Sequence, residues 1–214
     1  MTNEPKAPEG TAADLIAAGL KLFGQKGFAA TSTREIAAEA QANIASIAYH
    51  FGSKDGLRQA CGAEVARRIG AVLNASALPR PDTPQAAALQ MEMILRAMAR
   101  FVIASREAEP LIPFMLREVG EGGPVLDTVY AAMIEPMHRR FCALWGIATG
   151  QEAESEATKL TVFSLIGQVL YFRIGRPIVT RRLGWSDPGA DEAARIADIL
   201  AANLRSILER ERLS

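Results

Sequence analysis

The stretch that decides the fold is TSTREIAAEAQANIASIAYHF, residues 31–51. Its pattern predicts one short helix over residues 32–40 and a second over residues 43–51, joined by a turn of about three residues. Ser32, followed three residues later by Glu35, forms a capping box that opens the first helix. Two short helices joined by so short a turn are typical of a helix-turn-helix, a motif that places its second helix in the major groove of DNA.

The two short helices can lock together through apolar faces. Ile36 and Ala37 lie on one face, and Ile47 and Phe51, four residues apart, lie on the other. Asn43 can cap the second helix. The outward positions of that helix are slim, uncharged and rich in hydrogen-bonding groups, which suits insertion in a major groove. These candidate DNA-binding residues are Asn43, Ile44, Ala45, Ser46, Tyr49 and His50.

Ile44 has two interpretations, because an isoleucine can touch a thymine methyl group or pack inward. Tyr49 and His50 are adjacent on a short helix, so they cannot both face the core, and we expect both to contact DNA, chiefly its phosphates.

The rest of the chain predicts an all-α fold, since its apolar residues recur at three- and four-residue spacing and no run alternates as a strand would. Thr11 is the expected cap of the first helix, which Gly27 ends, and Ser53 is the expected cap of the fourth. The remaining helices are expected over residues 53–77, 84–105, 124–145, 152–174 and 190–212.

Prolines and glycines divide the chain. The segment Leu78–Pro84 is the best candidate for a boundary, and Pro110–Pro113 predicts a short irregular element. Pro136 should kink the helix that contains it. We expect three parts: a flexible N-terminal arm (1–10), a three-helix DNA-binding domain (11–56) joined through the helix that starts at residue 53, and a larger helical domain (57–214).

Composition limits the possible functions. Of 214 residues, 49% are hydrophobic and 22% charged, enough apolar surface for a core. Lys and Arg balance Asp and Glu at 24 each, so DNA contact must come from a few placed groups and not from a broad positive field. No run of about 18 apolar residues and no secretory signal are found, which predicts a cytoplasmic protein without a membrane span.

The two cysteines, Cys61 and Cys142, belong to no CxxC pair, and the only histidines are His50 and His138. We therefore expect no metal site and no cofactor. The simplest interpretation is that both cysteines pack as small buried hydrophobes; the alternative is a thiol switch between them.

The N-terminal region resembles the TetR-type transcriptional regulators. The matching residues are Leu22-Phe23, Gly27-Phe28, Thr31, Thr33 to Ala37, and Phe51 to Leu57. This resemblance implies that Thr33 and Arg34 at the start of the first motif helix, and Lys54 after the second, contact DNA phosphates. Two residues depart from the family pattern. Gln41 stands where glycine is usual, so the turn residue must accept an awkward backbone conformation. Ala48 stands where a DNA-contacting tyrosine is usual.

The segment 164–176 with Gly184-Trp185 resembles the C-terminal domain of the CecR-like branch of that family. The resemblance implies a homodimer on a pseudo-palindromic double-stranded operator, a repressor role, and a ligand cavity among the middle helices. Methionines and aromatic residues suit an adaptable apolar pocket for a small apolar or amphiphilic effector. The candidate ligand residues are Met98, Phe101, Phe114, Met115, Tyr130, Met133, Met137, Phe163 and Tyr171.

The segments 152–175 and 190–212 are expected to form the dimer interface. Their apolar faces carry Val162, Leu165, Ile166, Val169, Ile196, Ile199 and Leu200. Another group, Arg173, Arg176, Arg181 and Arg182, could hold an anionic ligand or form ion pairs across the dimer.

Two other classes of function compete with a ligand-responsive regulator. An enzyme could use His138 beside Glu135, but the chain has no Gly-x-Ser-x-Gly motif and no phosphate loop. A DNA-binding protein without a ligand would not need the large C-terminal part with its methionines and aromatic residues. We therefore expect no enzymatic activity.

Overall fold

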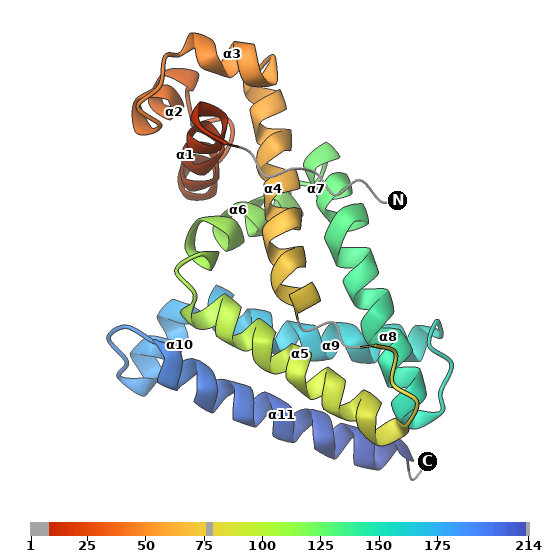
Figure 1. The fold of residues 1–214 in the computed structure, drawn as a ribbon. Helices are drawn as coiled ribbons and strands as arrows, with labels where there is room; N and C mark the ends of the chain where they lie inside the picture. The colour runs from red at the N-terminus through yellow and green to blue at the C-terminus, as the bar shows by residue number, and fades with distance from the viewer. Residues whose placement is uncertain (1–8, 76–78, 213–214) are drawn as a thin grey trace. The chain divides into compact units, whose positions relative to one another are not determined.

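The computed structural model describes residues 9–75 and 79–212, and within them every regular element is a helix, as the sequence predicts (Figure 1). Residues 1–8 of the predicted arm, and Leu78 of the predicted boundary, lie outside the described residues. The helices are α1 (Thr11–Lys26), α2 (Thr33–Glu39), α3 (Ala45–Phe51), α4 (Lys54–Ala75), α5 (Pro84–Ala104), α6 (Ala108–Glu121), α7 (Pro124–Val129), the π-helix η1 (Tyr130–Ile134), α8 (Glu135–Thr149), α9 (Glu156–Ile174), α10 (Arg176–Leu183) and α11 (Ala190–Arg212).

The chain forms two compact units that do not follow its order. Unit 1 comprises Met1–Ala71 and Glu109–Ile134, and unit 2 comprises Val72–Ala108 and Glu135–Ser214. Helices α6, α7 and η1 therefore belong with the N-terminal helices, although the sequence led us to group them with the larger C-terminal part.

Unit 1 is held together by close approaches at small residues. A Cβ atom added to Gly19 of α1 would lie 2.8 Å from Cys61 Sγ of α4, and one added to Gly62 of α4 would lie 2.6 Å from a Val125 methyl group of α7. Glycines thus let α1 and α7 pack directly on α4. The largest fully buried side chains of this unit include Leu15, Leu20, Phe23, Ile36, Leu57, Leu111, Ile112 and Phe114.

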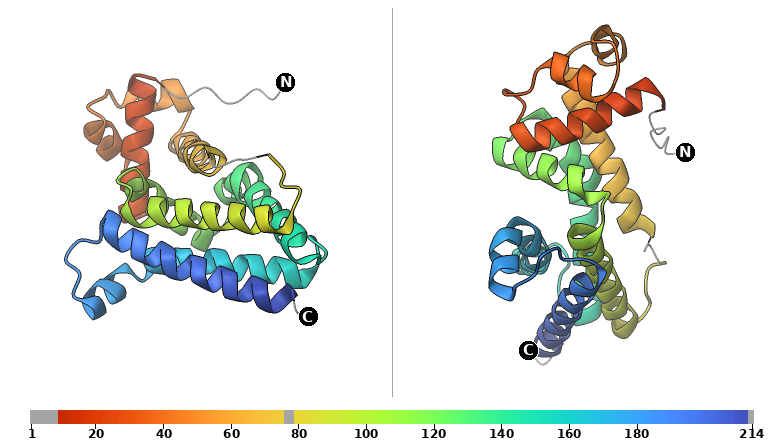
Figure 2. Two further views of the ribbon diagram at one scale, coloured as in Figure 1. Left: turned by 60° about the horizontal axis from the view of Figure 1, so that its bottom comes forward. Right: turned by 90° about the vertical axis from the view of Figure 1, so that its left-hand side faces the viewer.

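Unit 2 is a helical bundle in which α5 runs beside α11 in every view (Figure 2). Met91, Leu95 and Trp145 lie in its core. Ion pairs join the two neighbouring helices at their surface: Arg96 of α5 pairs with Asp198 of α11 at 2.6 Å, and Glu92 with Arg205 at 2.7 Å. Such exposed pairs each contribute little, so apolar packing carries the stability of the bundle.

Two predictions about local structure are wrong, and one helix was missed. Gly10, not Thr11, is the N-cap of α1, and no side chain caps that end. The predicted irregular element is instead the helix α6, because Pro110 lies in its first turn, where backbone N–H groups have no helical partner. Pro113 lies inside α6 and removes one helical hydrogen bond. Helix α10 was not predicted at all, and none of its residues is buried.

The predicted kink has a specific form. Pro136 is the second residue of α8, and the π-helix η1 ends two positions before it at Ile134. A proline has no N–H to donate to the preceding turn, so the irregular stretch lies over that turn. The helix then continues to Thr149, four residues beyond the predicted end, whereas α9 begins at Glu156 instead of residue 152.

Candidate nucleic-acid interface

Helices α2 and α3 and the turn between them form the predicted helix-turn-helix. The capping box is present: Glu35 N–H donates to Ser32 Oγ at 3.2 Å, and Ser32 N–H donates to Glu35 Oε2 at 2.8 Å. Asn43 Oδ1 accepts from Ala45 N–H at 2.9 Å, so its side chain does satisfy a backbone donor at the start of α3. The cap prediction is therefore confirmed for α2. For α3 the N-cap is Ile44, which makes no side-chain cap hydrogen bond, and the Asn43 contact lies one residue before it.

The turn adopts the strained conformation that its sequence predicts. Gln41 has φ of +51° and is the one non-glycine residue with positive φ in the described part of the chain. L-residues other than glycine pay a steric penalty in this region. The Ala42 N–H donates to Ala37 O at 2.9 Å, so the turn is nevertheless closed by a backbone hydrogen bond.

The outward face of α3 is open. Tyr49 is 85% exposed and Ile44 47% exposed, so Ile44 does not pack inward. Only Ile47 of α3 is buried. The other predicted contacts on this surface are exposed or half-exposed: Thr33, Arg34, Asn43, Ala45, Ser46 and His50. The Tyr49 and His50 rings meet edge to face at 4.9 Å. All of these residues therefore lie where a DNA groove or phosphate could reach them.

Lys54 has a partner that the sequence did not suggest. Its Nζ donates to the Phe28 carbonyl oxygen at 2.6 Å and lies 4.1 Å from the centre of the Phe28 ring. A lysine ammonium has three donors, so this contact leaves capacity for a phosphate. The phosphate contact of Lys54 stays a prediction. Phe28 was not among the candidate residues. The sequence does contain a signal for this contact, because Lys54 and Arg58 are four residues apart on one face of a helix and both can approach the same aromatic ring.

Two ion pairs fasten α1 to α2. Lys26 pairs with Glu35 at 2.7 Å, and Lys21 pairs with Glu39 at 2.5 Å. Hydrogen bonds from Lys26 and Ser32, with the Lys26 charge, lower the pKa of Glu35 from 4.5 to about 2. The orientation of α2 is therefore tied to α1 as well as to α3.

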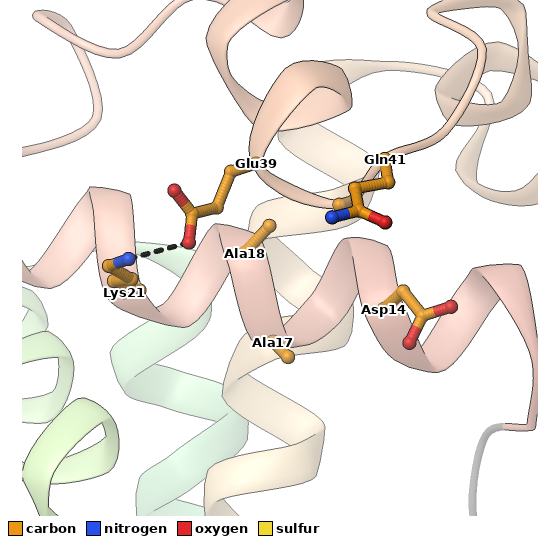
Figure 3. Close-up of a pocket in the computed structure, with 7 residues that line it drawn as sticks. Asp14, Ala17, Ala18, Lys21, Glu39 and Gln41 are labelled. Carbon is orange, nitrogen blue, oxygen red and sulfur yellow. Dashed lines mark hydrogen bonds and ion pairs between the residues drawn. The ribbon is translucent and has the colours of Figure 1, made fainter.

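An open groove of about 500 Å³ lies where α1 meets the end of α2 and the turn (Figure 3). Lys21 reaches across it from α1 to Glu39, and Gln41 lies on the side of the turn. The groove is lined by Asp14, Ala17, Ala18, Lys21, Glu39, Ala40 and Gln41. Its charged lining and wide opening differ from the apolar, enclosed pocket expected for the effector.

The nine candidate ligand residues are divided between the units. Phe114, Met115, Tyr130 and Met133 lie in unit 1, and Met98, Phe101, Met137, Phe163 and Tyr171 lie in unit 2. Their burial differs widely: Phe114 is fully buried and its ring lies 6.4 Å from that of Phe23, whereas Tyr130, Phe163 and Tyr171 are about half exposed.

The predicted dimer residues are mostly core. All seven except Ile199 are buried inside unit 2, so they cannot face a second chain. The reason is that the apolar residues of α9 lie on more than one side of the helix, and the deepest stripe packs within its own bundle. A second stripe of α9 remains exposed: Leu160, Phe163, Gly167, Tyr171 and Ile174.

The histidine considered for an enzyme is enclosed. His138 is 7% exposed, its ring stacks on Phe163 at 3.9 Å, and its Nε2 lies 3.3 Å from Lys159 O. Its Nδ1 faces the buried thiol of Cys142 at 3.6 Å, and burial raises the pKa of that thiol. A thiol that stays protonated is a poor nucleophile, so this cluster is not an accessible nucleophile–base pair.

Both cysteines are buried, as expected, and they lie in different units. Burial raises the pKa of Cys61 as well. Within the described residues, no three His, Cys, Asp or Glu side chains are grouped as metal ligands would be. None of the described helices alone is long and apolar enough to cross a membrane; the pair α9 and α10 reaches that level only across a 71° bend.

An exposed second helix, a capped first helix and a closed turn define a helix-turn-helix DNA-binding protein. Comparisons with known proteins identify its family. Residues 15–61 match the model of bacterial regulatory proteins of the tetR family, and residues 87–210 match the C-terminal domain of the HTH-type transcriptional dual regulator CecR. The chain belongs to the TetR family of transcriptional regulators, with a CecR-type C-terminal domain.

Relatives of known sequence and structure agree with this assignment. The transcriptional dual regulator CecR of Shigella flexneri is 34% identical, over 91% of this chain and 90% of its own. A TetR-like regulator from Rhodococcus superposes with a TM-score of 0.66 at 19% identity, covering 94% of this chain and 99% of its own. AibR, in complex with isovaleryl coenzyme A and operator DNA, superposes with 0.69 at 15% identity, covering 91% and 97%. The chain is thus a DNA-binding transcription regulator.

Proposed function

We propose that this regulator is a homodimeric, ligand-responsive repressor that docks two copies of α3 in successive major grooves of a pseudo-palindromic operator. The observation that carries the proposal is the outward face of α3, where Tyr49 is 85% exposed beside the exposed Asn43 and His50. Amide, hydroxyl and imidazole groups on a slim helix can read base edges and bind phosphates. We infer that these residues, with Thr33, Arg34, Ile44, Ala45, Ser46 and Lys54, contact the operator.

The experiment that tests this proposal is selection of bound duplexes from a random DNA library, followed by measurement of affinity for the selected site. A two-headed protein should select two half-sites whose centres lie one helical turn apart, about 10 base pairs, or a multiple of it. A single half-site, or no enriched sequence, would contradict the dimeric mode of binding. Fusing the selected site to a promoter then separates a repressor from an activator.

The exposed stripe on α9 supports the dimer. Leu160 and Phe163 are 62% and 52% exposed, and Tyr171 and Ile174 are 54% and 58% exposed. They recur at helical spacing around Gly167, whose position has open space within 4 Å of an added Cβ. Ile199 adds an exposed apolar side chain on α11. A contiguous apolar surface of this kind is typical of an interface.

The effector is, in this proposal, a small apolar or amphiphilic molecule that binds within unit 2, among the candidates Met98, Phe101 and Met137, which lie outside the exposed stripe of α9. The structural relative AibR is crystallised with both a coenzyme A ester and operator DNA, which supports a regulator of this fold responding to a small molecule. The effector must bind the DNA-free conformation more tightly than the DNA-bound one, because otherwise it shifts no equilibrium. A panel of apolar and amphiphilic compounds, scored for both thermal stabilisation and operator release, tests this point. If compounds stabilise the protein without releasing DNA, they occupy a cavity that does not signal.

A further inference from the structure

Phe28, in the segment between α1 and α2, is the meeting point of two cations from α4. Lys54 Nζ lies 4.1 Å and Arg58 Cζ 4.6 Å from the centre of its ring. The Phe28 carbonyl also accepts from Lys54 at 2.6 Å and from Thr31 N–H at 3.3 Å. A partly buried ring that faces two cations attracts both through its quadrupole. The α1–α2 segment is therefore bound to the first two turns of α4.

Arg58 is itself fixed from the other side. Its Nε donates to Glu118 Oε1 at 2.8 Å and its Nη2 donates to Glu121 Oε2 at 2.6 Å, both on α6. The Arg58 side chain is 18% exposed and that of Glu118 is 5% exposed, so solvent screens this pair little. A continuous set of contacts thus runs from α6 through Arg58 to Phe28, entirely within unit 1.

The location of Phe28 gives these contacts a consequence for recognition. Phe28 precedes the capping box of α2. Only two residues separate the end of α3 from the start of α4, where Gly56 N–H donates to Ser53 Oγ at 3.0 Å. The same first turns of α4 therefore follow the recognition helix and hold the segment that leads into α2. These contacts therefore connect the segment before α2, as well as the end of α3, to the start of α4.

We propose that Phe28 is a positioning residue for operator recognition: its ring, in contact with both Lys54 and Arg58, sets the orientation of α2 and α3 relative to α4. The proposal rests on operator binding as proposed above. It does not require Phe28 to touch DNA. Removing the ring leaves the positive charges of unit 1 unchanged. The proposal therefore predicts a loss of affinity for the specific operator but not for DNA of random sequence, which is bound mainly through charge.

The test compares Phe28→Leu with Phe28→Tyr in the full-length dimer. Leucine keeps an apolar side chain but has no quadrupole, whereas tyrosine keeps the ring. We expect Phe28→Leu to weaken affinity for the selected operator about tenfold, while affinity for a random duplex of equal length stays within about twofold. Phe28→Tyr should restore the operator affinity. Trp185→Leu removes a matching cation–π contact in unit 2, where Arg195 Cζ lies 5.3 Å from the indole, and should change neither affinity.

Circular dichroism and melting curves establish that each variant is folded at the assay temperature, and Phe28→Met replaces Phe28→Leu if the leucine variant is not. An unchanged operator affinity in the folded Leu or Met variant overturns the proposal. So does an equal loss on operator and random duplex, because that result marks a general structural role. If wild-type protein selects no operator, the proposed function itself fails, and this outcome is read from the wild type alone.

Discussion

At the scale of single residues, Gln41 adopts a strained backbone conformation that closes the turn between α2 and α3 and lowers the stability of the protein. Its φ of +51° is favourable for glycine and unfavourable for a side chain with a Cβ. Replacing it by glycine should stabilise the protein by about 1 kcal/mol, which raises the melting temperature by about 2–4 °C in a chain of this size. Gln41→Ala should give no such gain, because alanine has the same backbone restriction. A melting temperature that does not rise in Gln41→Gly would show that the turn is unstrained.

Glu35 makes the stability of the motif depend on pH. Its pKa is lowered from 4.5 to about 2 by hydrogen bonds with Lys26 and Ser32. A lowered carboxyl pKa means that the folded state favours the ionised form, so this contribution is complete above about pH 4.5 and is lost as the pH falls towards 2. In Glu35→Gln, the urea midpoint should therefore fall less steeply than in wild type over that range. Parallel curves for the two proteins would contradict the coupling.

Arg34 gives the clearest test of the predicted phosphate contacts. It is exposed at the start of α2, so Arg34→Ala should weaken operator binding without loss of folding. Each lost phosphate contact should reduce the slope of log affinity against log salt by about one unit. Arg80→Ala, also exposed but in unit 2, is the matched control and should leave the slope unchanged. The same slope in both variants and wild type would remove Arg34 from the interface.

At the scale of helices, the pair between Arg58 of α4 and Glu118 of α6 should matter more for stability than the exposed pairs. Arg58→Met leaves the carboxylate of Glu118 buried without its partner and should cost about 3 kcal/mol. The double change Arg58→Met with Glu118→Leu removes both charges and should cost much less than the two single changes together. Urea unfolding of the four proteins measures this coupling. Lys21→Met, in an exposed pair with Glu39, should cost about 0.5 kcal/mol or less.

Helix ends and interiors differ in how far the sequence predicts them. Ser32 with Glu35, and Ser53, mark starts that the structure confirms, because a cap is a local interaction among neighbouring residues. The element around Pro110 was predicted wrongly because a proline in a first turn looks the same in sequence as one that breaks a helix. Helix α10 was missed because its apolar and arginine residues have no buried face to impose a period.

At the scale of the whole chain, the DNA-binding site and the effector site differ in how far the sequence predicts their residues. The DNA-binding residues lie within about 20 consecutive positions, and on the second motif helix periodicity separates the outward from the inward face except at Ile44. Thr33, Arg34 and Lys54 were expected from the family resemblance instead. The ligand candidates come from distant helices, and no periodicity tells which core side chain borders a cavity. Phe114, for example, packs on the ring of Phe23 within unit 1. Likewise, α9 has apolar residues on more than one side, so the sequence could not say which stripe faces its own bundle and which a partner.

The exposed stripe of α9 gives the last prediction. Leu160 on α9 is 62% exposed, and Leu89 on α5 is 59% exposed. Because both leucines are exposed to a similar extent within unit 2, Leu160→Asp and Leu89→Asp form a matched pair of variants. If α9 forms the dimer interface, Leu160→Asp places an unpaired charge in it and should yield folded monomers at micromolar concentration, as measured by sedimentation equilibrium. Leu89→Asp should remain dimeric.

The same two variants connect assembly to function. A monomer presents a single α3 to DNA and loses the effective concentration that the second head provides, so Leu160→Asp should bind the operator about a hundredfold or more weakly. Affinity for an isolated half-site should be nearly unchanged, because each head keeps its own contacts. If Leu160→Asp stays dimeric and Leu89→Asp dissociates, the interface lies on α5. If both variants stay dimeric and bind normally, neither exposed leucine lies in the dimer contact, and the α9 stripe has another role.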